Sequence, residues 1–412
     1  MAESSLSIPM RLLVIEDDND WRDLLKRGFG LAAERMNVKL GLEQAQTIAD
    51  AKTLLRQGWF HAVSIDQNMP EVPGGKTSSE HGEDFAISCG RRAIPAFMAI
   101  YTGYPSIAKA NRIGRYTGAA YILKSMQTNP QPEQGEENGE QSMSALDYAT
   151  WFLQEFRRKY FQNVLVRAES CGDDKLADTA RKARKKYEKI YHGYALDSDF
   201  NGFLVQVDGL RDELLRCLTV YTYAIWSSEL KDCPLPRKDS TAGYRIKWLK
   251  DAWSKLEQQD EKSFKDWASY MMAGAEDSLM AVFIDKALSP LNRRRNKAQH
   301  ELIPYTSADF DRYIPQLIRF FDLLLWFTTR PIITQLVRRP FNLLAYHELN
   351  LREPEEREIF VSPQLLPEAK GHMVWTRLTD AEDAPFINIS DGYEVRRNRD
   401  GKLRFSAKGQ GF

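Results

Sequence analysis

Cysteine, histidine and long apolar runs are all scarce in this sequence. Its 412 residues include four cysteines and six histidines, and no two cysteines form a CxxC pair. This usage argues against a disulfide framework or a cysteine-ligated metal, so we interpret the four as reduced thiols of a cytoplasmic protein. The longest apolar stretch, 317–329, is interrupted by Arg319 and Asp322 and is shorter than the roughly 20 residues that span a bilayer. We therefore expect no membrane span, and the start, MAESSLSIPMR, lacks the pattern of a secretory signal.

The sequence also lacks a net charge, because 57 basic residues balance 57 acidic ones. No global field draws the molecule to a polyanion, so any contact with nucleic acid must be local. The apolar content of 43 % is enough to build real cores, and the length predicts two or three domains.

Composition divides the chain into four segments. From 11 to 126, short apolar runs alternate with amphipathic stretches, which predicts a parallel sheet with helices on both faces. Residues 127–141, QTNPQPEQGEENGEQ, carry four glutamates and no basic or apolar residue, as solvated linkers do. Apolar positions then recur at helical spacing to about 330, and β-prone runs follow, with a hairpin expected around Asp400 and Gly401. We predict a multidomain protein: an α/β doubly wound domain (1–126), an acidic flexible linker (127–141), an all-α helical domain (142–330) and a small β-rich C-terminal unit (331–412).

Polar residues follow the apolar runs of the first domain, where the ligands of doubly wound sheets collect. They are Glu16 and Asp17 after the first run, Asp66 after the third, Thr102 after the fourth and Lys124 after the fifth. Three carboxylates brought together repel one another unless a hard divalent cation neutralises them, and Mg²⁺ suits such oxygen ligands. One carboxylate can then attack phosphorus and become an acyl phosphate. Lys124 would pair with the phosphoryl oxygens, and Thr102 would donate a hydrogen bond to another of them.

The runs LLVIEDD, IDQNMP, IYTG and AAYILK resemble, in this order, the motifs of the response-regulator receiver domain. The resemblance implies a histidine kinase as the partner that donates phosphate and Mg²⁺ as the cofactor. It implies that Asp66 is the phosphoacceptor and that Mg²⁺ is bound by Glu16, Asp17, Asp66 and the backbone carbonyl of Asn68. It also implies a phosphate-dependent switch made of Thr102, Tyr121 and Lys124.

Two features depart from the receiver pattern. Ser125 stands where proline usually follows the lysine, so a cis X-Pro bond cannot be assumed there. The segment 71–81, EVPGGKTSSEH, is longer than the usual loop after the phosphoacceptor strand. It either covers the pocket and slows phosphate loss or is a tolerated surface insertion, and we favour the second interpretation.

In the helical segment, a basic run continues as RRRNKAQH and sets Arg295 and His300 five residues apart, with Asn296 beside the arginine. Five helical residues turn through roughly 500°, so the two side chains lie about 140° apart and can border one cleft that a helix end or a partner completes. Histidine can move a ribose proton near neutral pH, and arginine can hold the phosphate while charge builds on it. The other reading is a solvated helix end with His300 as a cap or surface residue.

The arginine–histidine pattern resembles the HEPN family of helical domains, whose ribonuclease members carry arginine, four to six residues and then histidine. The resemblance implies the catalytic residues Arg295, Asn296 and His300 and a homodimer that joins two motifs in one site. Our hypothesis is a two-component response regulator whose receiver controls a HEPN-like effector, a metal-independent ribonuclease acting on RNA in stress or anti-phage defence. A non-catalytic signalling adaptor and a phosphate sink, in which Asp66 only competes for phosphoryl groups, are the alternatives.

Overall fold

The chain divides into two compact units, 1–163 and 164–412. The computed structural model describes residues 8–92, 95–103, 107–124, 142–171, 173–237, 239–272, 277–329, 332–338, 344–349, 356–359, 374–376, 378, 387–389, 393–397 and 403–407. Within these residues, no helix combines the length and the apolar character that crossing a membrane requires.

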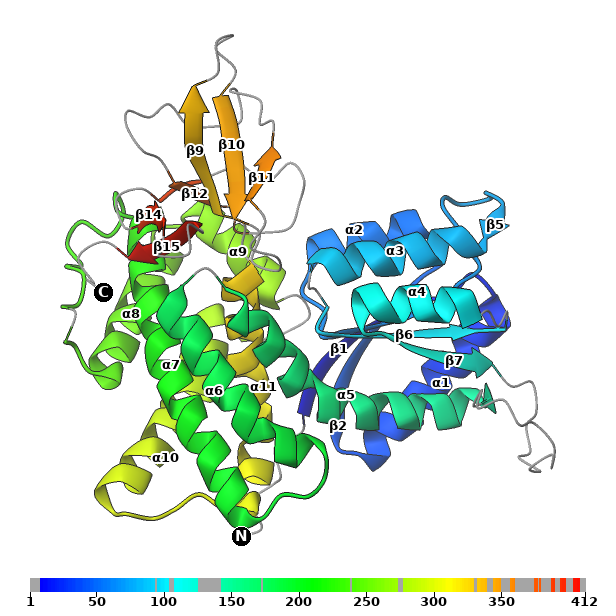
Figure 1. Cartoon of the computed structure of the whole chain (residues 1–412), viewed down its shortest axis with the longest axis horizontal. Helices are drawn as coiled ribbons and strands as arrows, with labels where there is room; N and C mark the ends of the chain where they lie inside the picture. Colours follow the sequence, from blue (N-terminus) through cyan, green and yellow to red (C-terminus); the bar gives the residue numbers. More distant parts are fainter. Residues whose placement is uncertain are drawn as a thin grey trace. The chain divides into compact units, whose positions relative to one another are not determined.

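The first unit is a parallel sheet between two layers of helices (Figure 1). Its strands are β1 (Ile8–Ile15), β2 (Val38–Ala45), β3 (Ala62–Ile65), β6 (Phe97–Thr102), β7 (Ala120–Lys124) and β8 (Ser142–Met143). Its helices are α1 (Asn19–Arg35), α2 (Ile48–Gln57), α3 (Ser79–Arg92), α4 (Ile107–Thr117) and α5 (Ala145–Glu169). The sheet order is β2-β1-β3-β6-β7-β8, and each neighbouring pair is parallel. The first five strands thus follow the doubly wound order 2-1-3-4-5, which confirms the α/β prediction.

Burial of both faces explains why β3, β6 and the second half of β1 are mainly apolar. Residues 12–15 of β1 are all nearly inaccessible to solvent, as expected for a central strand of a parallel sheet. Buried residues of α2, α3 and α4 form one cluster with the strands on one face. On the other face, α1 and α5 meet, and the rings of Phe29 and Phe152 lie edge to face at 5.3 Å. Asp18 caps α1 by accepting bonds from two backbone amides of its first turn.

The position of α5 differs from the division predicted by the sequence. We had assigned residues 142 onward to the helical domain, whereas Tyr148 and Phe152 pack on the sheet of the first unit. Tyr148 stacks on Tyr101 of β6 with ring centroids 3.9 Å apart, and Phe152 meets Phe97 at 4.9 Å. The physical reason is that the second face of a parallel sheet must be covered, and α1 alone does not cover it.

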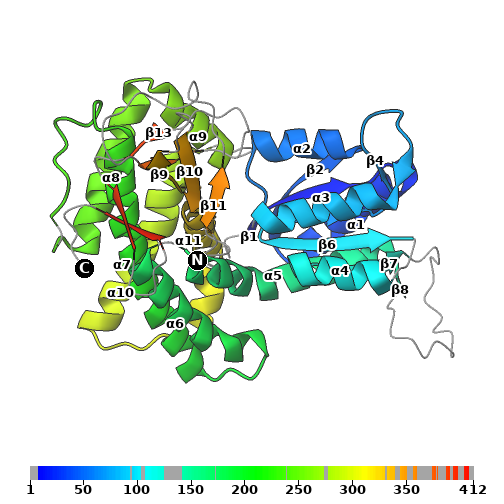
Figure 2. The same ribbon diagram turned by 45° about the horizontal axis from the view of Figure 1, so that its top comes forward.

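The second unit is mostly helical, as predicted. Its helices are α6 (Asp174–Tyr191), α7 (Asp197–Ile225), α8 (Ala242–Gln258), α9 (Lys262–Met272), the π-helix η1 (Met280–Leu288), α10 (Ser289–His300) and α11 (Ser307–Thr329). Helices α6 and α7 run side by side in both views (Figure 1, Figure 2). Indole rings fill the core between helices. The ring centroid of Trp267 lies 4.8 Å from that of Trp326 and 5.4 Å from that of Trp253. Rings of this size bury much apolar area, so they account for a large part of the packing energy.

Strands near the C-terminus form two small sheets. They are β9 (Ile332–Arg338), β10 (Leu344–Leu349), β11 (Glu356–Ile359), β12 (Val374–Thr376), β13 (Ile387–Asn388), β14 (Tyr393–Arg397) and β15 (Leu403–Ala407), in the orders β11-β10-β9-β12-β13 and β14-β15. The hydroxyls of Tyr221 in α7 and Thr376 in β12 are 2.8 Å apart, so these strands share the compact unit of the helices. The sequence-based division had set 331–412 apart. The linker 127–141, Ser125 and the turn at Asp400 and Gly401 lie outside the described residues.

Candidate functional site

Three carboxylates meet at the carboxyl edge of the first sheet. Glu16 and Asp17 follow β1 directly and Asp66 follows β3, the parallel neighbour in which Ile65 is in register with Ile15. One carboxylate oxygen from each of the three acids lies within 4.8 Å of the others. The backbone fixes this arrangement, because the amide of Asp66 donates to the carbonyl of Ile15 at 2.8 Å.

Lys124, the last residue of β7, crosses the pocket to two of these acids. Its Nζ lies 2.7 Å from Oε2 of Glu16 and 2.9 Å from Oδ2 of Asp66, and all three side chains are buried. Burial lowers the pKa of the Lys124 ammonium, but the charges of Asp66 and Glu16 outweigh burial, so the net shift of its pKa is upward. The lysine therefore stays charged and can follow negative charge that develops on Asp66.

One lysine does not neutralise three carboxylates. Burial, followed by the charge of Asp66, raises the pKa of Glu16 from 4.5 to about 8. The pKa of Asp17 is raised for the same two reasons. Oε1 of Glu16 is buried and has no hydrogen-bond partner among the described residues. A hard divalent cation such as Mg²⁺ fits this set, because it binds carboxylate oxygens and relieves both the repulsion and the unpaired atom.

The remaining receiver-motif residues lie on β6, on β7 and in the loop after β3. Thr102 ends β6 and is fully buried. Tyr121, in β7, donates its hydroxyl to Oε1 of Gln67 at 2.6 Å. The backbone amide of Asn68 donates to Oδ1 of Asp66 at 3.4 Å, a long contact. Glu16, Asp17, Asp66, Asn68, Thr102 and Lys124 therefore come from strand ends or loops at one edge of the sheet, and Tyr121 lies inside β7.

Two aromatic rings that the sequence patterns did not single out lie close to the ammonium group of Lys124. Nζ of Lys124 lies 5.2 Å from the ring centroid of Trp21 and 5.9 Å from that of Tyr101. Tyr101 stacks on Tyr148, whose hydroxyl is 2.7 Å from that of Ser64 in β3. Cation–π contact adds to the preference for a charged lysine. Tyr101, directly before Thr102, could have indicated such a contact, because its ring carries a polar hydroxyl inside an otherwise apolar strand.

The insertion after Asp66 folds as a small hairpin. Strands β4 (Met69–Pro70) and β5 (Thr77–Ser78) pair antiparallel, and the turn between them is exposed. Glu71 pairs with Lys52 of α2 at 2.8 Å, both side chains being about half exposed. The exposed turn and the contact to α2 favour the surface-insertion interpretation.

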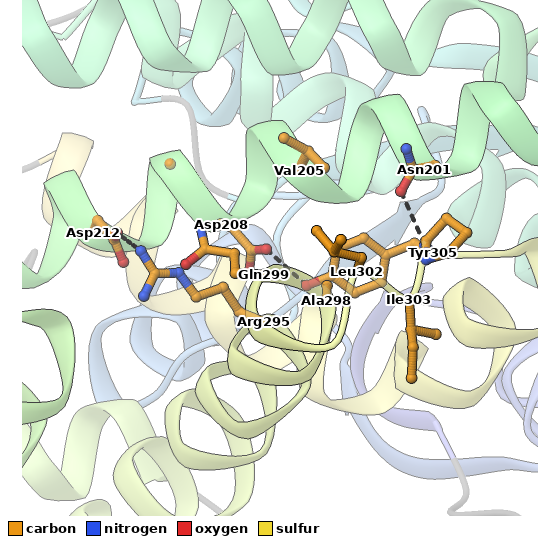
Figure 3. A pocket seen from close by; sticks show the side chains of 12 residues that line it. Asn201, Val205, Asp208, Asp212, Arg295, Ala298, Gln299, Leu302, Ile303 and Tyr305 are labelled. Carbon is orange, nitrogen blue, oxygen red and sulfur yellow. Dashed lines mark hydrogen bonds and ion pairs between the residues drawn. The ribbon is translucent and has the colours of Figure 1, made fainter.

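The arginine–histidine motif lies on α10 in the second unit. Arg295 lines a groove of about 420 Å³ between α7 and α10, and its Nη2 is 3.3 Å from Oδ2 of Asp212 (Figure 3). Asn296 and His300 are exposed and are not among the residues that line this groove. The preceding Arg294 is buried and bonded to Asp309 at 2.8 Å, a contact that holds α10 to the start of α11. The structure thus places Arg295 in a cavity that does not include His300.

The groove has a polar end and an apolar end. Burial raises the pKa of Asp208, one of its polar residues, to about 6, against the lowering influence of Arg211. The hydroxyl of Tyr305 donates to Asp208 at 2.7 Å. Nε of Arg295 is buried without an acceptor among the described residues. The apolar end includes Leu302, which is 84 % exposed.

The strand order and the acidic pocket with its lysine define the class: the N-terminal part of the chain has the fold of a CheY-like response-regulator receiver domain. Several solved structures are similar to part of this chain. A CheY-like receiver domain protein from Methanospirillum hungatei JF-1 is 16 % identical and matches 38 % of this chain and 97 % of its own, with a TM-score of 0.25. A receiver domain of a putative Luxo repressor protein from Vibrio parahaemolyticus is also 16 % identical, matching 38 % of this chain and 96 % of its own, with a TM-score of 0.28.

A third similar structure is a response regulator from Burkholderia pseudomallei that holds a phosphorylated aspartic acid, a calcium ion and citrate. It is 22 % identical over 29 % of this chain and 61 % of its own, with a TM-score of 0.23. No protein-family model and no curated protein matches the chain. The assignment of the class rests on the strand order and on the residues of the acidic pocket.

Proposed function

We propose that this protein is a two-component response regulator that accepts a phosphoryl group on Asp66 from a histidine kinase. The observation that carries the proposal is the buried Asp66 carboxylate, with Lys124 at 2.9 Å and two further acids within reach of one cation. In the reaction, an Asp66 oxygen forms a bond to phosphorus as the P–N bond to the kinase histidine breaks, and that histidine leaves with the bonding pair.

Each neighbour of Asp66 has a role in this step. Glu16, Asp17 and Asp66, with the carbonyl of Asn68, would hold Mg²⁺, which when bound supplies positive charge to the transferring phosphoryl oxygens. Lys124 would exchange its contact with the carboxylate for one with a phosphoryl oxygen. The hydroxyl of Thr102 would donate to another oxygen, and Tyr121 would respond to that movement.

Phosphorylation of the full chain by acetyl phosphate and Mg²⁺ tests this proposal. Mass spectrometry should detect one added phosphoryl group on the wild type and none on Asp66→Asn. Lys124→Met should still fold but accumulate much less phosphoprotein, because the phosphoryl charge loses its cation. Asp23→Asn, which removes an exposed carboxylate of α1, is the matched control and should behave as the wild type. Labelling of Asp66→Asn at the wild-type level would exclude Asp66 as the acceptor.

For the second unit we propose a HEPN-like effector that cuts RNA without a metal in a cytoplasmic stress or anti-phage response. Arg295 would hold the phosphate, and its buried Nε–H without an acceptor supports an anionic ligand. His300, exposed at the C-terminal end of the same helix, would move the ribose proton, and Asn296, which is also exposed, would assist from outside the groove. Since the groove does not include His300, a second copy in a homodimer would complete the site.

RNA incubation with the wild type, His300→Ala and Arg293→Ala, each with and without beryllofluoride, tests the effector. Arg293 is the control, because it is an exposed arginine of the same helix. Cleavage should be lost in His300→Ala and kept in Arg293→Ala, and equal cleavage by the wild type and His300→Ala would refute the assignment.

One observation favours the alternative, a non-catalytic adaptor. Leu302 and Ile303 line the apolar end of the groove and are exposed, and adjoining exposed apolar residues can mark a protein-binding surface. Complex formation that depends on Asp66 phosphorylation, together with undetectable cleavage, would favour the adaptor. Full biological activity of Asp66→Ala would exclude both a phosphate sink and a phosphorylation switch.

A further inference from the structure

The residue that follows Asp66 is buried and hydrogen-bonded to Tyr121. Gln67 is 1 % exposed, and its Oε1 accepts the hydroxyl of Tyr121 at 2.6 Å. Gln67 follows β3 and Tyr121 lies in β7, while β6, which ends at Thr102, lies between these strands in the sheet. The bond therefore spans the strand that carries the switch hydroxyl. It connects the phosphoacceptor loop directly to the switch aromatic.

Packing alone does not account for a glutamine at this position. Nε2 of Gln67 is buried and has no acceptor among the described residues. An unpaired buried donor is unfavourable, whereas leucine or methionine would fill a similar volume without one. The feature that distinguishes glutamine from these residues here is the carbonyl oxygen that Tyr121 uses.

The backbone of Gln67 has little freedom to move. A Cβ atom built on Gly82, in the first turn of α3, would lie 2.5 Å from the carbonyl oxygens of both Asp66 and Gln67. Helix α3 therefore packs directly on this loop. The ring of Tyr121, in contrast, is only partly buried and packs against the core cluster on the α2–α4 face. A fixed acceptor thus meets a side chain that has room to turn.

We propose that Gln67 is a positioning residue for the phosphorylation switch, whose carboxamide holds the Tyr121 ring against the core before Asp66 is modified. The proposal rests on Asp66 being the phosphoacceptor. Because the aromatic is already turned toward the core, less rearrangement is required when Thr102 moves to the phosphoryl group. Binding of a phosphoryl mimic is consequently tighter than it would be with an untethered tyrosine.

The test measures beryllofluoride affinity in the presence of Mg²⁺, by ¹⁹F NMR on the full chain. Gln67→Leu removes the acceptor and keeps the volume, and Tyr121→Phe removes the donor and keeps the ring. Each should weaken affinity by about 2- to 10-fold, the range for one neutral hydrogen bond. The double variant should be no weaker than either single variant, because both changes remove the same bond. Gln44→Leu is the control, since the side chain of this β2 glutamine donates to the backbone carbonyl of Arg22 at 2.9 Å and makes no bond to Tyr121 or Gln67 among the described residues.

The outcomes separate this inference from the proposed function. A wild type that neither binds beryllofluoride nor accepts phosphate overturns the proposed function and this inference with it. If the wild type binds but Gln67→Leu and Tyr121→Phe bind equally well, the inference is overturned and Asp66 remains the acceptor. Lower melting temperatures with unchanged affinity would mean that the bond has a structural role only, which also overturns the inference. Should Gln67→Leu fail to fold, Tyr121→Phe decides by itself, because it leaves the loop intact.

Discussion

Replacing Phe152 by alanine tests whether α5 belongs to the receiver fold. Phe152 is fully buried, and its ring lies 4.9 Å from Phe97 of β6 and 5.3 Å from Phe29 of α1. It therefore joins α1, α5 and the sheet at one point. Removing it leaves a cavity among rings that are themselves held by the sheet and α1.

The expected cost is about 3–5 kcal/mol, the usual range for a buried phenylalanine replaced by alanine. Each 1.4 kcal/mol changes an equilibrium constant tenfold. Amide hydrogen exchange of β1, β3 and β6 should therefore be faster by roughly 100- to 4,000-fold, provided these strands exchange by cooperative opening of the first unit. Hydrogen exchange with mass spectrometry on the full chain measures these exchange rates separately for the first and the second unit.

The neighbouring Trp151→Ala is the control, because Trp151 is partly exposed on the same helix. It should change exchange in the strands by far less than Phe152→Ala does. Unchanged exchange in β1, β3 and β6 in Phe152→Ala, with faster exchange in α6 and α7, would refute the assignment of α5 to the receiver fold.

Three further predictions concern single positions. Gly82→Ala should abolish phosphorylation by acetyl phosphate, because its Cβ would lie 2.5 Å from two backbone carbonyls, whereas Gly30→Ala, with nothing within 4 Å, should not. Arg294→Met should lower the free energy of unfolding in urea by about 3 kcal/mol by stranding a partly buried carboxylate, and the exposed Arg293→Met by under about 0.5 kcal/mol. Burial raises the pKa of Asp208 from 3.8 to about 6, so the folded state favours the protonated acid. The contribution of Asp208 to stability should therefore be fully present below about pH 4 and be lost, by up to about 3 kcal/mol, as the pH rises through 6, and the difference in stability between the wild type and Asp208→Asn in melting curves should follow this course.

The receiver fold could be predicted because its chemistry is local in the sequence. Glu16, Asp66 and Lys124 each follow an apolar run directly, so the runs fix the strands and the strand ends fix the pocket. Glu16, Asp66 and Lys124 were named on this basis, and the structure brings them within hydrogen-bonding distance. Gln67 was missed because a polar residue beside Asp66 is expected at any strand end. Its role depends on reaching Tyr121 across another strand, which no spacing in the sequence encodes.

The arginine–histidine motif shows a different limit. A five-residue separation on a helix sets the two side chains about 140° apart, and this much follows from the sequence. It does not say which side of the helix faces the core. In the structure, Arg294 is buried and Arg295 turns toward Asp212 of α7, while His300 is exposed. Those orientations depend on which face of α10 packs on α7 and α11, and so on tertiary contacts.

Helix α5 was assigned to the wrong domain because its apolar periodicity does not specify which structure the apolar face packs against. Buried residues such as Ala149, Phe152 and Phe156 recur at helical spacing, and the same pattern would suit a helical bundle or one face of a sheet. The acidic stretch 127–141 separates it in sequence from the strands, which suggested a domain boundary. In a doubly wound sheet, however, both faces must be covered. Without a second helix beside α1, Phe97 of β6 and the side of the Phe29 ring that contacts Phe152 would be exposed to solvent. The requirement to bury both faces of the sheet therefore outweighs the change in composition at 127–141. In a sequence of this kind, the first amphipathic helix after such a stretch is expected to complete the receiver fold when only one helix precedes it on that face.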